Sequence, residues 1–130
     1  MREILFHGKR ADNGEWVEGI LFNAEEDTFI IPHGNEYSYN PIEGLAFDVY
    51  GCKVAPETVG QYTGLTDRNG KKIFEGDIIE FHEEIGKIKY SDYDAAFDII
   101  FDTWNTNFSE IYEKNVEVIG NIHENPELLR

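Results

Sequence analysis

The chain has 130 residues, of which 26 are Asp or Glu and 11 are Lys or Arg, so its formal net charge is −15 at pH 7. A chain of this length with 41% hydrophobic residues can bury a core without disulfides. The negative charge argues against direct binding to nucleic acid, because the phosphates must be neutralised by Lys and Arg.

The same composition bears on cellular location. No apolar stretch approaches the roughly 20 residues that a membrane-spanning helix needs, and the polar start Met1-Arg2-Glu3 is unlike a signal peptide. The single cysteine, Cys52, cannot form a disulfide within the chain. We therefore expect a cytoplasmic protein without a membrane role, in which Cys52 is a buried structural thiol.

The N-terminal half predicts short strands separated by turns. The predicted strands cover residues 3–7, 15–22, 28–31 and 45–50. Asp12-Asn13-Gly14 is a hairpin signal between the first two, and Pro32 ends the third. Residues 23–27 are expected to form an acidic loop, and residues 33–41 a polar loop. The alternation in Leu45–Tyr50 favours a strand, with one turn of helix as the alternative.

A joint is expected at residues 51–57, which contain Pro56. It would separate a β-rich subdomain, residues 1–55, from a second subdomain, residues 56–130. In the second subdomain the predicted strands cover residues 59–63, 78–81, 87–90, 95–101 and 116–122. The hairpin turn between the second and third is expected at residues 83–86. Residues 103–115 read as irregular or as a helical turn, and Pro126 is expected to end regular structure.

Short strands with turns about every eight to twelve residues indicate a mainly β protein with minor α content, built as a small barrel or sandwich. Strand 95–101 should bury Phe97, Ile99 and Phe101, which directs Ala96 and Ile100 outward. Such apolar surface, together with tyrosines Tyr37, Tyr39 and Tyr50, predicts a homo-oligomer. The alternative is that the N-terminal subdomain covers these residues within one chain.

The stretch Thr58–Phe81 has the densest turn punctuation in the chain. The residues singled out as its structural motif are Gly60, Gly64, Asp67, Asn69, Gly70, Gly76 and Asp77. Asn69-Gly70 suits positive φ, and the Asp67 carboxylate can accept a hydrogen bond from the backbone two residues on. Asp77 starts a strand after Gly76, where anchoring the turn through backbone N–H groups is favoured over catalysis.

No pattern of catalytic or cofactor-binding residues is complete. Gly64 to Lys72 misses the phosphate-binding loop, because its spacing is wrong and Lys72 stands where a hydroxyl is needed. A calcium loop starting at Asp67 fails because lysines fill two of its positions. The four histidines are not at zinc spacing, and we expect no metal and no cofactor. We expect Trp16 and Trp104 to lie in the core.

Four stretches of the sequence are similar to the YopX family, small proteins encoded by phages and prophages of bacteria. These stretches are Met1–Phe6, Pro56–Leu65, Asp67–Ile78 and Val118–Leu129. The resemblance implies a C-terminal β-barrel of the SH3 type, with a long hairpin within Asp77–Tyr90, beside a smaller N-terminal subdomain. It implies no cofactor or catalytic residue. Members often have Arg where this chain has His7.

Three functions are consistent with these features. The first is a non-enzymatic binding or assembly protein that acts through protein–protein contacts with a host or phage protein. The second is an acidic inhibitor that imitates DNA at a host nucleic-acid enzyme; the acid excess is spread along the chain, which also fits a merely solubilising surface. The third is an enzyme that uses Asp77 or Asp67, and perturbed titration of an acid in a cleft would favour it.

Overall fold

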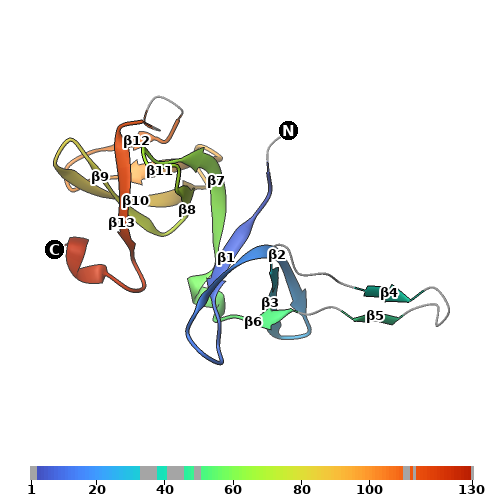
Figure 1. Ribbon diagram of the computed structural model, residues 1–130. Coiled ribbons are helices and arrows are strands. Elements are labelled where there is room, and N and C mark those ends of the chain that lie inside the picture. Colours follow the sequence, from blue (N-terminus) through green and yellow to red (C-terminus); the bar gives the residue numbers. More distant parts are fainter. Residues whose placement is uncertain are drawn as a thin grey trace. The chain divides into compact units, whose positions relative to one another are not determined.

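A computed structural model of the chain describes residues 3–32, 38–40, 46–48, 51–109, 112 and 114–129, with only the backbone described at 38–40 and 46–48 (Figure 1). The chain is mainly β, with antiparallel sheets and almost no helix, as its sequence predicts. It divides into two compact units, one of Ile4–Val59 and one of the residues from Gly60 onward with Glu3. No helix in the described ranges is long and apolar enough to cross a membrane.

The unit Ile4–Val59 consists of short strands and one turn of 3-10 helix. Its elements are β1 (Phe6–Lys9), β2 (Trp16–Ala24), β3 (Asp27–Pro32), β4 (Ser38–Asn40), β5 (Ala46–Asp48), β6 (Cys52–Lys53) and η1 (Pro56–Thr58). Strands β6, β3, β2 and β1 lie side by side in that order, and β4 pairs with β5. An isolated bridge between Arg10 and Val54 also ties the segment after β6 to the end of β1.

The first hairpin confirms its turn signal. Gly14 has φ of 75°, and its N–H donates to the carbonyl of Arg10. The Asn13 side chain accepts the N–H of Glu15, so the turn is stabilised by its own Asn and Gly. The predicted acidic loop at residues 23–27 is wrong. Strands β2 and β3 are joined by two residues only, and the first of them, Glu25, has φ of 59°.

The structure also bears on the loop, the strand and the joint predicted for the rest of this unit. Within the predicted loop 33–41, Ser38–Asn40 forms β4 and pairs antiparallel with β5. The prediction of a strand at Leu45–Tyr50 is confirmed for Ala46–Asp48. The remaining residues of 33–41 and of 45–50 lie outside the described residues. The side chains of Tyr37, Tyr39 and Tyr50 also lie outside them. The predicted joint at 51–57 itself contains β6 and η1, and Cys52 is half-buried there.

A small core holds this unit together. Ile30 of β3 and Val54 are almost fully buried. Both lie against Gly8 of β1, where an added Cβ would lie 3.1 Å from Ile30 Cδ1 and 3.2 Å from Val54 Cβ. Thr58 Oγ1 accepts the N–H of Lys9 at 2.9 Å, so η1 is fixed to β1 by a side chain of its own.

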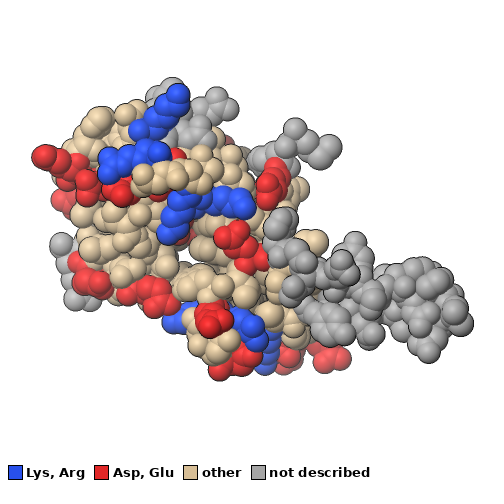
Figure 2. All heavy atoms as spheres, viewed as in Figure 1, with Lys and Arg blue, Asp and Glu red and all other residues tan. Residues whose placement is uncertain are grey.

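Acidic and basic side chains both reach the surface in the view of Figure 2, among a larger area of other residues. The carboxylates lie in several separate groups, with Lys and Arg between them. In the described part of the chain, three ion pairs link basic and acidic side chains: Arg10–Asp12, Lys53–Asp27 and Arg68–Glu117. All six side chains are at least partly exposed, so these pairs contribute little to stability.

The second unit contains a sheet of five strands. Its elements are β7 (Gly60–Thr66), β8 (Lys72–Phe74), β9 (Asp77–Phe81), β10 (Glu84–Ser91), β11 (Ala96–Ile100), β12 (Asn105–Asn107), β13 (Val116–Asn121) and the 3-10 helix η3 (Pro126–Leu129). Five of these strands form an antiparallel sheet in the order β12-β11-β10-β9-β13. Strand β7 pairs with β8, with a register shift between Tyr62 and Thr66.

The structure corrects three predictions in this unit. Part of the segment 103–115 is a strand, β12, that pairs with β11. Pro126 begins the 3-10 helix η3, whereas regular structure was expected to end there. The hairpin between β9 and β10 exists, but its turn is His82-Glu83 and not residues 83–86. Gly86 is therefore a buried strand residue.

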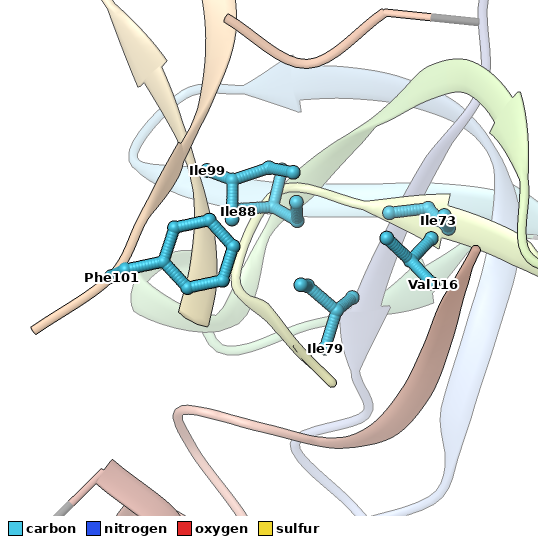
Figure 3. Close-up of a cluster of buried hydrophobic side chains, with 6 residues drawn as sticks. All are labelled: Ile73, Ile79, Ile88, Ile99, Phe101 and Val116. Carbon is cyan, nitrogen blue, oxygen red and sulfur yellow. The ribbon is translucent and has the colours of Figure 1, made fainter. Parts of the chain in front are cut away.

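The core of the second unit contains one or two residues from each of five segments (Figure 3). The cluster consists of Ile73, Ile79, Ile88, Ile99, Phe101 and Val116. Ile99 and Phe101 confirm the predicted inward face of β11, and Phe97 packs against the cluster. Because Gly86 has no side chain, Ile99 and Phe101 can approach its backbone; an added Cβ would lie 2.9 Å from Ile99 Cγ2 and 3.0 Å from Phe101 Cδ1.

Candidate functional site

The side chain of Asp67 organises the turn at the centre of the chain. Its Oδ1 accepts the backbone N–H groups of Asn69, at 2.8 Å, and Lys71, at 2.9 Å. Its Oδ2 accepts the N–H of Val118 in β13 at 3.0 Å. Burial acts to raise the pKa of this carboxyl, but the three N–H donors outweigh burial and hold the pKa below its ordinary value. Asp67 is therefore a structural carboxylate that stays ionised.

The exposed part of the same turn also joins β13. The Arg68 N–H donates to the carbonyl of Val116 at 3.0 Å, and the Arg68 guanidinium pairs with Glu117. The side-chain amide of Asn69 reaches the same carboxylate at 3.4 Å. The turn thus closes over the strand through backbone and side-chain contacts together.

Three glycines of the motif have positive φ: 90° at Gly64, 80° at Gly70 and 95° at Gly76. Gly64 lies within the register shift between β7 and β8, where the backbone must bend. An added Cβ at Gly70 would have no atom within 4 Å. Glycine is therefore favoured at position 70 because the backbone there has a positive φ, and not because a side chain would be crowded. Gly60, the fourth glycine, is the buried first residue of β7.

Asp77 starts β9 and is almost completely buried, with 5% of its surface exposed. Its Oδ2 accepts the N–H of Phe74 at 2.9 Å, which confirms its predicted role as an anchor of the turn between β8 and β9. Burial is the main cause that raises its pKa to about 7; Asp67 adds to the rise, while the Phe74 N–H and Lys71 oppose it. The carboxyl consequently stays protonated well above the pH at which an exposed Asp ionises.

A perturbed acid is a signature of catalytic sites, but it also occurs in structural positions. Neither Asp67 nor Asp77 lines either of the two hollows of the second unit that are described below. Both oxygens of Asp67 and Oδ2 of Asp77 accept backbone N–H groups. In this motif Asp67 and Asp77 are therefore carboxylates that each fix a turn.

The remaining candidate residues are dispersed. The ring of His7 packs against Trp16, with centroids 4.8 Å apart. His82 lies in the turn between β9 and β10, and His123 follows β13. Among the described residues, no three His, Cys, Asp or Glu side chains are grouped so that they could hold a metal ion.

A surface feature of the second unit was only partly visible in the sequence. Two hollows lie on the sheet, one of about 470 Å³ and one of about 320 Å³. The larger is lined by Glu83, Ile85, Lys87, Ile100, Phe101, Asp102, Leu128 and Leu129. The smaller is lined by Lys89, Tyr90, Ser91, Asp92, Tyr93, Asp98, Ile100 and Asn105. Ile100 belongs to both, and we call the surface around the two hollows the Ile100 face.

Strand alternation explains why these residues meet. Ile85, Lys87 and Lys89 have the same parity on β10, so their side chains leave the sheet on the same side. Lys87 is paired with Ile100 in register, and Lys89 with Asp98. This is the side of β11 opposite to Ile99 and the core, as the sequence pattern predicts. The η3 helix contacts β10 and adds Leu128 and Leu129 to the larger hollow.

The Ile100 face gathers half of the exposed large hydrophobic side chains of the described residues. Six such side chains are at least 38% exposed, and three of them, Tyr90, Tyr93 and Leu129, line the hollows. Trp104 is 39% exposed but lines neither hollow; it stacks on Phe101 with ring centroids 4.5 Å apart. The expectation that Trp104 lies in the core is therefore wrong. Apolar and aromatic surface gathered in one place is typical of an interface.

Sequence reasoning identified Ile100 as outward-facing but missed the rest of this surface. The outward alternation of Ile85, Lys87 and Lys89 was a usable signal, and the misplaced turn at residues 83–86 concealed it. The contribution of Leu128 and Leu129 had no local signal, because a 3-10 helix of four residues carries no periodicity.

The fold defines the class of this protein. It is a small, mainly β protein of two compact units, in which the turn Asp67–Gly70 is hydrogen-bonded to the distant strand β13. The family model described as YopX protein matches residues 6–130. The chain belongs to the YopX family. Its structure is similar to the crystal structure of protein EF1440 from Enterococcus faecalis, with 26% sequence identity, a TM-score of 0.67 and complete coverage of both chains. No curated protein matches the chain.

Proposed function

We propose that this YopX-family protein is a non-enzymatic binding and assembly protein that acts through protein–protein contacts. The observation that carries the proposal is the Ile100 face, where three of the six exposed large hydrophobic side chains gather, namely Tyr90, Tyr93 and Leu129. Scattered single apolar residues are normal on a protein surface, but a gathered set of aromatic and aliphatic side chains is not. The burial of Asp67 and Asp77 within turns supports the non-enzymatic part of the proposal.

Self-association is the form of assembly that can be tested without a known partner. Copies that each carry a charge of −15 repel one another, so added salt should strengthen association by screening. Light scattering on a sizing column at low and high salt measures the mass directly. A mass above that of one chain, rising with salt, is expected; a single-chain mass at tens of micromolar in both conditions would contradict self-association.

Matched variants locate the interface. Ile100→Glu places a charge at the centre of the Ile100 face and should return the protein to a single chain. Ile20→Glu is the control, because Ile20 is 57% exposed and lies on β2 of the other unit. If the control dissociates the assembly and Ile100→Glu does not, the Ile100 face is not the interface. Affinity capture from phage-infected cells with the same pair of variants tests for a host or phage partner.

The acidic DNA mimic is less well supported. A mimic needs carboxylates in paired rows with the spacing of phosphates, and the face seen in Figure 2 shows separate acidic groups interrupted by Lys and Arg. Competition between this protein and duplex DNA for a nucleic-acid enzyme would be the direct test.

Two finer features belong to the same proposal. We infer that the unit from Gly60 onward is arranged as an SH3-type barrel, which is supported by its β9–β10 hairpin and by the hydrogen bond from Arg68 to Val116. The proposed setting is the cytoplasm of a bacterium that carries the phage or prophage, consistent with one unpaired cysteine.

A further inference from the structure

The larger hollow of the Ile100 face combines an apolar floor with a charged rim. Ile85 and Ile100 come from the sheet, and Leu129 approaches from η3. Glu83 and Asp102 stand at the rim and have no ion pair among the described residues. Lys87 supplies the one positive charge of the lining, so carboxylates exceed ammonium groups by one.

The smaller hollow repeats this combination beyond Ile100. Tyr90 and Tyr93 supply its apolar surface, while Asp92 and Asp98 stand against Lys89. The Asp98 carboxylate already has a partner, because the side-chain amide of Asn107 donates a hydrogen bond to its Oδ1 at 2.6 Å. Asp92 is exposed and makes no ion pair in the described part of the chain. The two hollows thus form one surface that has Ile100 between its two apolar parts, Lys87 and Lys89 beside it on β10, and the carboxylates of Glu83, Asp102 and Asp92 without an ion pair to any described residue.

The turn that presents Glu83 has an unusual backbone. His82 and Glu83 have φ of 47° and 69°, in the left-handed region where side chains other than Gly and Asn cost energy. A two-residue hairpin turn requires this conformation, but Asn-Gly would meet the requirement without strain. Local strain of this kind is concentrated at functional positions. Here the strained residue is the one whose carboxylate lines the hollow.

We propose that the Ile100 face binds an extended, cationic segment of a partner protein, in which apolar residues alternate with Lys or Arg. This inference rests on the proposed function and names the chemistry of the partner. Alternate side chains of an extended segment point to opposite sides. The apolar side chains enter the two hollows on either side of Ile100, and the cations at the two ends of the segment, where the chain leaves the hollows, reach Glu83 and Asp102 at one end and Asp92 at the other. The charge of −15 increases the rate of encounter with such a segment.

The test uses the full chain and fluorescein-labelled octapeptides, with fluorescence anisotropy as the readout. The probe is a peptide of alternating Leu and Lys. Two control peptides separate the contributions: alternating Ser and Lys keeps the charge without the apolar residues, and alternating Leu and Glu reverses the charge. The Leu-Lys peptide should bind about tenfold or more tightly than either control, because both the hollows and the rim contribute.

Variants then locate the binding. Glu83→Lys combined with Asp102→Lys should weaken the Leu-Lys peptide by about tenfold or more, since like charges across an interface are strongly unfavourable. Ile100→Lys should weaken it at least as much. Glu57→Lys makes one such charge reversal, half the change of the double variant, on an exposed residue of the other unit and should leave binding within about twofold. The fold of each variant is checked by its circular dichroism spectrum and its unfolding midpoint.

Several outcomes would overturn the inference. Equal binding of the Ser-Lys peptide would mean that general charge attraction suffices. Tighter binding of the Leu-Glu peptide would show that the lysines of β10 select an acidic partner. Equal effects of Glu57→Lys and the double variant would place the site elsewhere. If no peptide binds but Ile100→Glu dissociates an oligomer, the face binds a second copy, and the proposed function stands while this inference fails.

Discussion

The backbone N–H of Val118 donates a hydrogen bond to Oδ2 of Asp67 at 3.0 Å, although 51 residues separate them in the chain. The other carboxylate oxygen of Asp67 accepts two N–H groups within its own turn. One buried side chain therefore shapes a turn and attaches it to a distant strand. This double role accounts for an Asp at the start of the Asp67–Gly70 turn without any ligand.

Replacing this carboxylate should strongly destabilise the protein. In Asp67→Ala, the N–H groups of Asn69, Lys71 and Val118 lose their acceptor, and the free energy of unfolding should fall by more than about 3 kcal/mol. Chemical denaturation measures the loss. Asp12→Ala is the control, because its ion pair with Arg10 is local and exposed, and its midpoint should barely change. Similar midpoints for the two variants would show that β13 does not depend on Asp67.

The raised pKa of Asp77, about 7, predicts a specific pH dependence. Its ordinary value of 3.8 applies to the unfolded chain. Because the folded protein favours the protonated form of Asp77, this carboxyl contributes fully to the free energy of unfolding below about pH 4. The contribution is lost as the pH rises to about 7. Each unit of pKa corresponds to about 1.4 kcal/mol.

Asp77→Asn keeps an acceptor for the Phe74 N–H and cannot ionise. The stability of the variant relative to the parent protein should therefore increase by up to about 4 kcal/mol between pH 4 and pH 8. Thermal unfolding across this pH range gives the difference. Glu57→Gln controls for the removal of one carboxylate from the surface. A stability difference that is constant with pH would show that Asp77 is ionised in the folded protein throughout.

Gly70→Val should lower the free energy of unfolding by more than about 1 kcal/mol, because Gly70 has φ of 80° and a β-branched side chain is strained there. No atom lies within 4 Å of the added Cβ, so crowding does not contribute. Gly70→Asn should cost less, since Asn tolerates the left-handed region. The unfolding midpoints of the two variants check this order, and the reverse order would point to a requirement other than backbone conformation.

Gly86→Ala tests the close packing inside the second unit. The added Cβ would lie 2.9 Å from Ile99 Cγ2 and 3.1 Å from the carbonyl oxygen of Ile100. Overpacking of this kind costs about 1–3 kcal/mol, which urea denaturation can measure. An unchanged midpoint would mean that β10 and β11 can separate locally at no cost.

Local chemistry in the sequence was sufficient to predict the turns and the inward faces. Asn13-Gly14, Gly70 and the Asx turn of Asp67 depend on residues within four positions of one another. The burial of Phe97, Ile99 and Phe101 follows from a period of two. By contrast, the predicted turn at residues 83–86 was wrong, because His82-Glu83 adopts a conformation that its residue types do not favour.

Only the tertiary structure decided which residues share the Ile100 face. Ile85, Ile100 and Leu129 come from β10, β11 and η3, and strand register and helix docking bring them together. The partnership of Asp67 with Val118 and the raised pKa of Asp77 have the same origin. Hydrogen bonds between distant segments, and the burial that they allow, arise from the folded arrangement and leave no pattern within any one stretch of the chain.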